Sequence, residues 1–337
     1  VVLVWTGAVR VDNGYITQGE VVALINYMSQ ILVELVKLAN LIININKSIA
    51  CGNRIQSIFE MQPSITDGSG QKVDKVRTDT ADRSEEAEYA VEFSHVGLPY
   101  AGAGDESLTD IDFKVKKGET IGIIGGTGSG KSSVVNLIPR FYDVTSGFIK
   151  VDGKDVKDYP LEELRGKIGT VLQKAVLFHG TIRENLKWGN PDATEEDLNR
   201  AITVAQAKEF VDNKEGGLDF EIEQGGKNLS GGQRQRLTIA RAVVKKPEIL
   251  ILDDSASALD FATDAALRKA IREMEGETTV FIVSQRAASI QHADRIVVLD
   301  DGKIVGLGTS EELLESCEVY QEIYNSQFKK QEGGKTA

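Results

Sequence analysis

An α/β fold with a parallel core sheet is predicted for this chain by three features of its sequence. Residues 125–132 read G-x-x-x-x-G-K-S, the form of a phosphate-binding loop, between a β-branched run and an amphipathic helical pattern at 131–138. An apolar segment at 21–43 predicts helices that precede the sheet. Short apolar runs typical of parallel strands recur at 249–252, 279–283 and 296–299.

The glycines of the loop allow successive backbone N–H groups to turn toward an anion at the start of the following helix. Lys131 is then expected to reach the β- and γ-phosphates of a nucleotide, and the Ser132 hydroxyl to ligate Mg²⁺. An ordinary glycine-rich turn before a helix has the same form, so the interpretation depends on further motifs.

Composition limits the classes of protein that fit. The 337 residues can hold one large α/β domain plus an appendage, and 41% hydrophobic with 27% charged residues is typical of a folded chain. Lys plus Arg number 39 against 51 Asp plus Glu, for a net charge of −12, which argues against nucleic acid as a partner. Cys51 and Cys317 lack metal-ligand spacing and are expected to be buried or inert thiols in a reducing compartment.

The first helical segments leave two interpretations open. Residues 1–9 are almost all apolar with no charged region before them, which predicts a piece of a longer protein rather than a signal peptide. Residues 21–43 are long enough to cross a bilayer core. They carry a polar stripe within an arc of about 120°, which suits a membrane helix facing a water-filled cavity and equally an amphipathic helix on a soluble core. The stripe consists of Asn26, Gln30, Glu34, Lys37, Asn40 and Asn44.

The organisation after this segment is read from composition and periodicity. A helical pattern continues to Met61, and Pro63 ends it. Residues 64–88 are polar and predict a linker. Alternating segments at 90–96, 108–115 and 148–152 predict a small antiparallel β-subdomain around the phosphate loop. Residues 174–228 are expected to be mainly helical, notably 195–211.

Two further motifs favour nucleotide chemistry. Residues 229–233 read LSGGQ and precede an Arg-rich helical stretch, so their small residues can form a second nest for phosphate. Residues 249–253 read ILILD, a buried strand that delivers Asp253 to its exposed end, where a carboxylate can hold Mg²⁺. Each motif alone has an ordinary structural explanation. Their order after a phosphate loop is improbable by chance.

At these residues the sequence resembles the ATP-binding cassette (ABC) family, specifically exporters whose membrane and ATPase domains share one polypeptide. The resemblance implies a P-loop NTPase cassette with a parallel core sheet, an antiparallel β-subdomain and a helical signature subdomain, preceded by membrane-domain helices. It implies the end of the membrane domain at 1–63, the linker at 64–88, the nucleotide-binding domain at 89–330 and a tail at 331–337.

The same resemblance assigns the site residues for ATP and Mg²⁺. Gln173 matches the glutamine that senses Mg²⁺ and the attacking water, and is expected to join Ser132 and Asp253 at the metal. Tyr100 occupies the place of the aromatic residue that stacks on adenine, although VGLPY departs from the usual surroundings. The implied nucleotide-binding set is Tyr100, Gly126, Thr127, Gly128, Ser129, Gly130, Lys131, Ser132, Ser133, Ser230, Gly231, Gly232, Gln233 and Asp260.

Two catalytic positions depart from the family pattern. The glutamate that polarises the hydrolytic water is replaced by Asp254, whose carboxylate is one methylene, about 1.5 Å, shorter. The switch histidine is replaced by Gln285, which can donate a hydrogen bond but cannot carry a proton's charge. The shorter reach of the Asp254 carboxylate can lower the rate of hydrolysis about 10²-fold.

The intact LSGGQ together with these departures resembles the degenerate half of a heterodimeric exporter. The chain is then expected to complete the site of a second half-transporter, while its own site turns over slowly. The resemblance implies a plasma membrane location with a cytoplasmic cassette, and drugs, lipids or peptides as cargo. Two alternatives remain: a soluble ABC ATPase, and a regulatory module that binds ATP without hydrolysing it.

Overall fold

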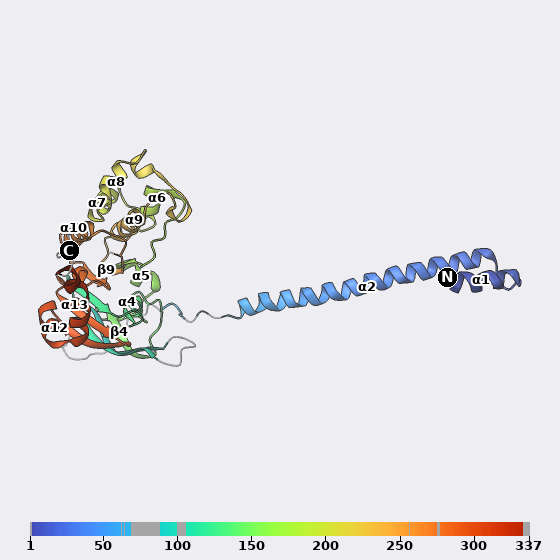
Figure 1. Ribbon diagram of the computed structural model, residues 1–337, viewed down its shortest axis with the longest axis horizontal. Helices are drawn as coiled ribbons and strands as arrows, with labels where there is room; N and C mark the ends of the chain where they lie inside the picture. The colour runs from blue at the N-terminus through green and yellow to red at the C-terminus, as the bar shows by residue number, and fades with distance from the viewer. Residues whose placement is uncertain are drawn as a thin grey trace. The chain divides into compact units, whose positions relative to one another are not determined.

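The computed structural model describes residues 2–61, 63, 65–68, 88–99, 106–255, 257–274 and 277–332, and the chain divides into two units, 1–66 and 67–337 (Figure 1). Most of the predicted linker at 64–88, Tyr100, and the chain after residue 332 lie outside the described residues.

The first unit is a pair of helices, α1 (Val2–Asp12) and α2 (Gln18–Phe59). A capping box starts α2: the Thr17 hydroxyl accepts the Glu20 N–H at 3.3 Å, and the Glu20 carboxylate accepts the Thr17 N–H at 2.7 Å. The helices meet where Gly7 faces Val21, because a Cβ at Gly7 would lie 2.8 Å from a methyl group of Val21.

Helix α2 joins the two predicted segments, 21–43 and the pattern up to Met61, into 42 continuous residues. Among the described residues it is the one helix long and apolar enough to cross a membrane, with a mean hydropathy of 1.6 over its most apolar window. At 1.5 Å per residue it is about 63 Å long, roughly twice a bilayer's hydrocarbon thickness. Only part of α2 can therefore lie in lipid.

In the described part of the second unit, six strands form the core sheet in the order β12-β11-β3-β10-β9-β6. Neighbours pair in parallel except the edge strand β12, which is antiparallel to β11. The sheet is therefore mixed only at that edge, and its middle strands are almost fully buried, as expected when both faces are covered. The strands are β3 (Thr120–Gly125), β6 (Ile168–Val171), β9 (Ile249–Asp253), β10 (Thr279–Val283), β11 (Arg295–Asp300) and β12 (Lys303–Gly308).

The predicted antiparallel subdomain is a sheet of order β2-β1-β4-β5. Its strands are β1 (Tyr89–Pro99), β2 (Glu106–Lys116), β4 (Ser146–Val151) and β5 (Lys154–Asp155). Phe93 and Phe113 stack across β1 and β2 with ring centroids 4.7 Å apart. They share one apolar core with helix α4 (Lys131–Leu137) and the core sheet, so the phosphate loop is held between the two sheets. Helix α5 (Leu161–Lys167) leads into β6.

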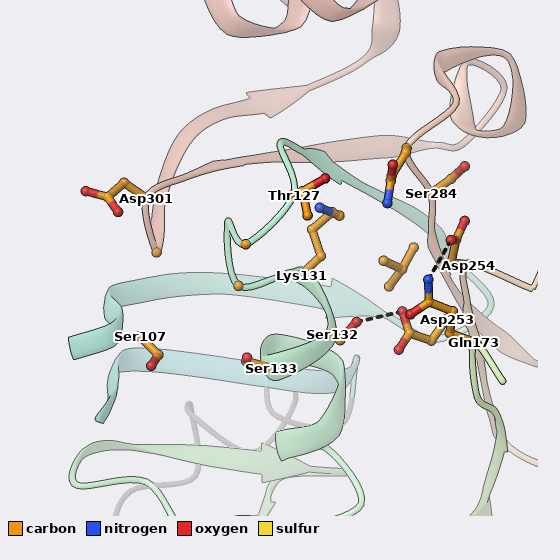
Figure 2. A pocket seen from close by; sticks show the side chains of 15 residues that line it. Ser107, Thr127, Lys131, Ser132, Ser133, Gln173, Asp253, Asp254, Ser284 and Asp301 are labelled. Carbon is orange, nitrogen blue, oxygen red and sulfur yellow. Dashed lines mark hydrogen bonds between the residues drawn. The ribbon is translucent and has the colours of Figure 1, made fainter. Parts of the chain in front are cut away.

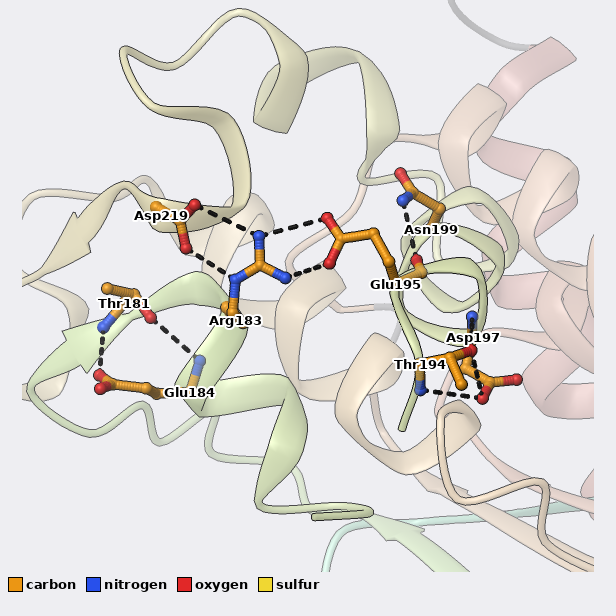
Figure 3. Close-up of polar contacts among 8 residues, drawn as sticks. All are labelled: Thr181, Arg183, Glu184, Thr194, Glu195, Asp197, Asn199 and Asp219. Carbon is orange, nitrogen blue, oxygen red and sulfur yellow. Dashed lines mark hydrogen bonds and ion pairs between the residues drawn. The ribbon is translucent and has the colours of Figure 1, made fainter. Parts of the chain in front are cut away.

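The helical region contains α6 (Ile182–Lys187), α7 (Glu195–Val204), α8 (Lys208–Asp212) and α9 (Gly231–Val243), with a small β7–β8 pair (Gly180–Thr181 and Glu221–Ile222). The helical character predicted for 195–211 is present, divided between two helices. The chain breaks between α7 and α8, where Gln206 has a φ of 55° that an α-helix does not allow. Arg183 ties the region together through ion pairs with Glu195 and Asp219 (Figure 3).

Helices α10 (Phe261–Arg272), α11 (Ala287–Ile290), α12 (Ser310–Ser316) and α13 (Glu318–Glu332) complete the unit. None of these four helices was predicted from the sequence. Tyr320 on α13 is fully buried in a cluster with Ile124 of β3 and Ile290 of α11, which anchors the C-terminal helix to the core sheet. Cys317 is buried in the same cluster, whereas Cys51 is exposed on α2.

Candidate nucleotide-binding site

A cavity of about 480 Å³ opens where β3, β9 and β10 end, at the carboxyl edge of the parallel strands (Figure 2). Ligands in open α/β sheets bind at this edge. The cavity brings together residues from six separate stretches of sequence. Its lining comprises Ser107, Thr127, Gly128, Gly130, Lys131, Ser132, Ser133, Gln173, Asp253, Asp254, Val283, Ser284, Gln285, Asp301 and Gly302.

The phosphate loop follows β3 directly and ends at the first residue of α4. Gly128 and Gly130 have φ values of 87° and 92°, which side-chain-bearing residues rarely adopt. The Lys131 ammonium donates to the carbonyl oxygens of Gly125 at 3.0 Å and Gly126 at 2.5 Å, with the Ser129 hydroxyl at 3.4 Å. Burial lowers the pKa of Lys131, opposed by the charges of Asp254 and Asp253. The loop therefore holds a buried cation against its own carbonyl groups, at the cavity that would receive a phosphate.

Ser132 and Asp253 meet at the floor of the cavity. The Ser132 hydroxyl donates to a carboxylate oxygen of Asp253 at 3.0 Å, although the two residues are 121 positions apart. Asp253 is 5% exposed, and burial raises its pKa above the ordinary value. A hydroxyl and a carboxylate are the hard oxygen donors that Mg²⁺ takes in proteins, so these residues fit the predicted metal site.

Asp254 lies at the next position and turns toward a different partner. Its φ is 44°, a left-handed conformation that Asp tolerates better than most residues. Its backbone N–H donates to the Val283 carbonyl at 2.9 Å, and its carboxylate accepts a hydrogen bond of 3.1 Å from the Gln173 side chain. Gln173 and Asp254 are thus together at the cavity, as Figure 2 shows.

Gln285 lines the cavity from the segment after β10. The Ser284 hydroxyl beside it accepts the Arg286 N–H at 2.9 Å. Arg286 donates to the Ser257 carbonyl at 3.3 Å, so this segment also contacts the loop that follows Asp254.

The LSGGQ residues do not line this cavity. Ser230 caps α9 through a capping box in which its hydroxyl accepts the Gln233 N–H at 3.2 Å. Gly231 and Gly232 are the first residues of that helix. Asp260 caps α10, accepting the Thr263 N–H at 2.9 Å. A Cβ at Gly232 would lie 3.2 Å from the Ala258 carbonyl, so the LSGGQ segment and the loop before α10 pack closely.

Five lining residues were not among the predicted site residues: Ser107, Val283, Ser284, Asp301 and Gly302. Ser107 lies on β2, and Asp301 and Gly302 form the turn between β11 and β12, with φ values of 43° and 74°. Asp-Gly between apolar runs is a strong hairpin signal that was present in the sequence. It predicts the turn but not its place beside the phosphate loop, which depends on strand order.

A second hollow of about 370 Å³ lies beside the segment that carries Gln173. Leu172, Phe178 and Trp188 are 50%, 45% and 69% exposed there, and the rings of Phe178 and Trp188 are 5.1 Å apart. Arg241 on α9 donates to the Val176 carbonyl at 2.5 Å and fixes this segment. This groove combines exposed apolar side chains with Lys174, Arg241 and Lys245, and it was not predicted from the sequence.

Comparison with known proteins agrees with this geometry. Residues 108–257 match the family described as ABC transporter. An uncharacterized ABC transporter ATP-binding protein of Bacillus subtilis strain 168, YfiB, is 40% identical over 326 residues, covering 97% of this chain and 54% of the relative. YgaD of the same strain, named as a candidate multidrug export ATP-binding/permease protein, is 37% identical over 318 residues, covering 94% of this chain and 53% of the relative.

Among solved structures, a bacterial Atm1-family ABC exporter with ATP bound superimposes with a TM-score of 0.75 at 29% identity. The match covers 93% of this chain and 53% of the exporter chain, so the chain spans little more than half the length of these relatives. The matches extend beyond the nucleotide cavity to the N-terminal helices. The chain belongs to the ABC transporter family, as an exporter-type ATP-binding domain fused to membrane-domain helices.

Proposed function

We propose that this chain is the ATP-binding and hydrolysing subunit of an ABC exporter that powers efflux of drugs, lipids or peptides. The observation that carries the proposal is the meeting of Lys131, Ser132 and Asp253 in one cavity. A lysine ammonium in a glycine-rich loop suits the phosphates of ATP, and the hydroxyl–carboxylate pair suits Mg²⁺. Mg²⁺ would neutralise charge on the β- and γ-phosphates there.

The chain's own site is proposed to turn over slowly. Asp254 lines the cavity at the position where the family pattern has the glutamate that polarises the hydrolytic water, and its side chain is one methylene shorter. Its oxygen is also engaged by Gln173 at 3.1 Å. Gln285 can donate a hydrogen bond toward the terminal phosphate but cannot exchange a proton with it. Binding is therefore supported more strongly than rapid hydrolysis.

The intact LSGGQ is proposed to serve a second half-transporter. The chain's own cavity does not include the residues Ser230, Gly231, Gly232, Gln233 and Asp260. They lie instead at the starts of α9 and α10, where backbone N–H groups favour an anion. A partner's nucleotide placed against this surface would complete that site. This supports a heterodimer in which the partner's site is the faster one.

The exposed groove beside Gln173 is proposed to receive a cytoplasmic segment of the membrane domain. The segment that forms one wall places Gln173 against Asp254, while its neighbours Leu172 and Lys174 line the groove. A helix or loop seated on Phe178 and Trp188 would bury apolar surface and shift the Gln173 segment. The part of the relatives that this chain does not span can supply that segment.

A multi-pass location in the plasma membrane follows from the proposed exporter. The polar stripe of α2, which includes Gln30 and Glu34, would face a water-filled path or neighbouring helices rather than lipid. The cassette would lie in the cytoplasm, where ATP is supplied.

Single-turnover hydrolysis tests the proposal. The chain, purified with its partner half-transporter, is expected to hydrolyse ATP slowly at its own site, and Asp254→Glu combined with Gln285→His should raise that rate by about 10²-fold. Adding Lys131→Ala should remove the gain, which assigns it to this site. Hydrolysis by the unsubstituted chain as fast as by the double variant would refute the slow site. Complete absence of product at this site would favour the ATP-binding regulatory module.

A further inference from the structure

One side chain of the C-terminal helix α13, Gln327, forms hydrogen bonds with the backbone of the segment that carries Gln285. The Gln327 amide nitrogen donates to the Gln285 carbonyl at 2.7 Å, and its amide oxygen accepts the Ala287 N–H at 2.9 Å. Ala287 is the first residue of α11, and the residue before it, Arg286, provides no side-chain cap. Gln327 therefore supplies from α13 the cap that α11 lacks.

The two hydrogen bonds fix the backbone on both sides of Arg286. Gln285 lines the nucleotide cavity, and Arg286 donates to the Ser257 carbonyl at 3.3 Å while its guanidinium lies 5.5 Å from the Phe261 ring. The Gln327 amide pairs its N–H donor with a backbone carbonyl and its oxygen acceptor with a backbone N–H. No other side chain of this length offers both a donor and an acceptor in this arrangement. The directions in which Gln285 and Arg286 point thus depend on Gln327.

Helix α13 is rigid enough to act as this support. Tyr320 is fully buried and its hydroxyl lies 2.8 Å from the Ser310 hydroxyl. The helix packs on α11, β3 and β11 through an apolar cluster that also contains Ile124 and Ile296. Gln327 itself is half-buried, between this anchor and the cavity segment.

We propose that Gln327 is a positioning residue for the nucleotide site, which keeps Gln285 directed at the phosphate end of the cavity. The C-terminal helix α13 thereby helps to position a residue that lines the nucleotide cavity. The inference rests on the proposed nucleotide site and adds to it a residue that touches neither nucleotide nor metal.

Three variants of the full chain in detergent test this. Gln327→Ala removes both hydrogen bonds, Gln327→Glu keeps the acceptor for Ala287 but loses the donor for Gln285, and Gln321→Ala is the matched control on the same helix. Hydrogen exchange of the Ala287 amide should speed up about tenfold in Gln327→Ala, stay close to the unsubstituted rate in Gln327→Glu, and not change in Gln321→Ala. Unchanged exchange in Gln327→Ala would overturn the inference.

The dissociation rate of bound ATP then separates positioning from simple stabilisation. We expect Gln327→Ala to raise this dissociation rate about three- to tenfold, and Gln327→Glu to give a rate between those of the unsubstituted chain and Gln327→Ala. In a Gln285→Ala background the same substitution should add almost nothing, because Gln327 acts through Gln285. An equal effect in both backgrounds would contradict positioning. If the unsubstituted chain failed to bind ATP, the proposed function would fail, whereas the exchange comparison would still decide whether Gln327 holds the segment.

Discussion

Lys131→Ala should weaken ATP binding, because it removes a positive charge from the phosphate-binding loop. A unit charge 4 Å from a phosphate charge contributes about 4 kcal/mol at an effective dielectric constant of 20. Before ATP binds, the ammonium already has the Gly125 and Gly126 carbonyls at 3.0 and 2.5 Å, so part of this energy is offset. We expect a net loss of about 2–3 kcal/mol, which is about a 30- to 150-fold rise in Kd.

The assay is a titration of a fluorescent ATP analogue with the full chain in detergent. Lys208→Ala is the matched control, because it removes the same charge from an exposed position on α8. The control should bind within about twofold of the unsubstituted chain. Circular dichroism of Lys131→Ala should show a folded protein. A folded Lys131→Ala that binds ATP within threefold of the original would refute the phosphate-loop role.

Three further outcomes are expected. Because α2 is long and apolar, the full chain should need detergent, whereas a chain that starts at Glu88 should be soluble and still bind ATP; a monodisperse full chain in plain buffer would contradict this. Burial raises the pKa of Asp253, so its carboxylate becomes protonated at a higher pH than exposed carboxylates do. Mg²⁺-dependent ATP binding should therefore weaken as pH falls through that raised value. A Mg²⁺ titration at several pH values checks this, and Asp253→Asn should abolish the pH dependence. Asp264→Ala should lower the free energy of unfolding by about 3–5 kcal/mol in a denaturant titration of the chain from Glu88, because Arg268 would lose its buried partner at 3.0 Å.

The parts of this fold that depend on local patterns were predictable from the sequence. The strand, glycine loop and helix around Lys131 follow from adjacent residues, and the apolar runs at 249–253 and 279–283 are strands as expected. The helical segment predicted at 195–211 is divided at Gln206, whose left-handed backbone leaves no signal in an apolar pattern that continues on both sides. Tertiary packing decided that break.

The parts of the site that depend on long-range contact were not predictable from spacing. Ser132 and Asp253 are 121 positions apart, and the contact between Gln173 and Asp254 spans 81. Their roles came from resemblance to a family, and they remain predictions. The Gln327 contacts with the segment around Arg286 had no motif at all, since a glutamine on an amphipathic helix is indistinguishable in sequence from a solvated one.

The division of labour between two sites is the central claim, and the steady-state ATPase activity of the reconstituted pair tests it most directly. Ser230→Ala removes a group of LSGGQ, and Thr194→Ala removes an equivalent capping box from α7 as its control. Asp254→Asn alters the chain's own site. The account predicts a loss of about 10²-fold for Ser230→Ala, little change for Thr194→Ala and a much smaller loss for Asp254→Asn. Abolished turnover in Asp254→Asn with an active Ser230→Ala would contradict it, because this chain would then carry the working site.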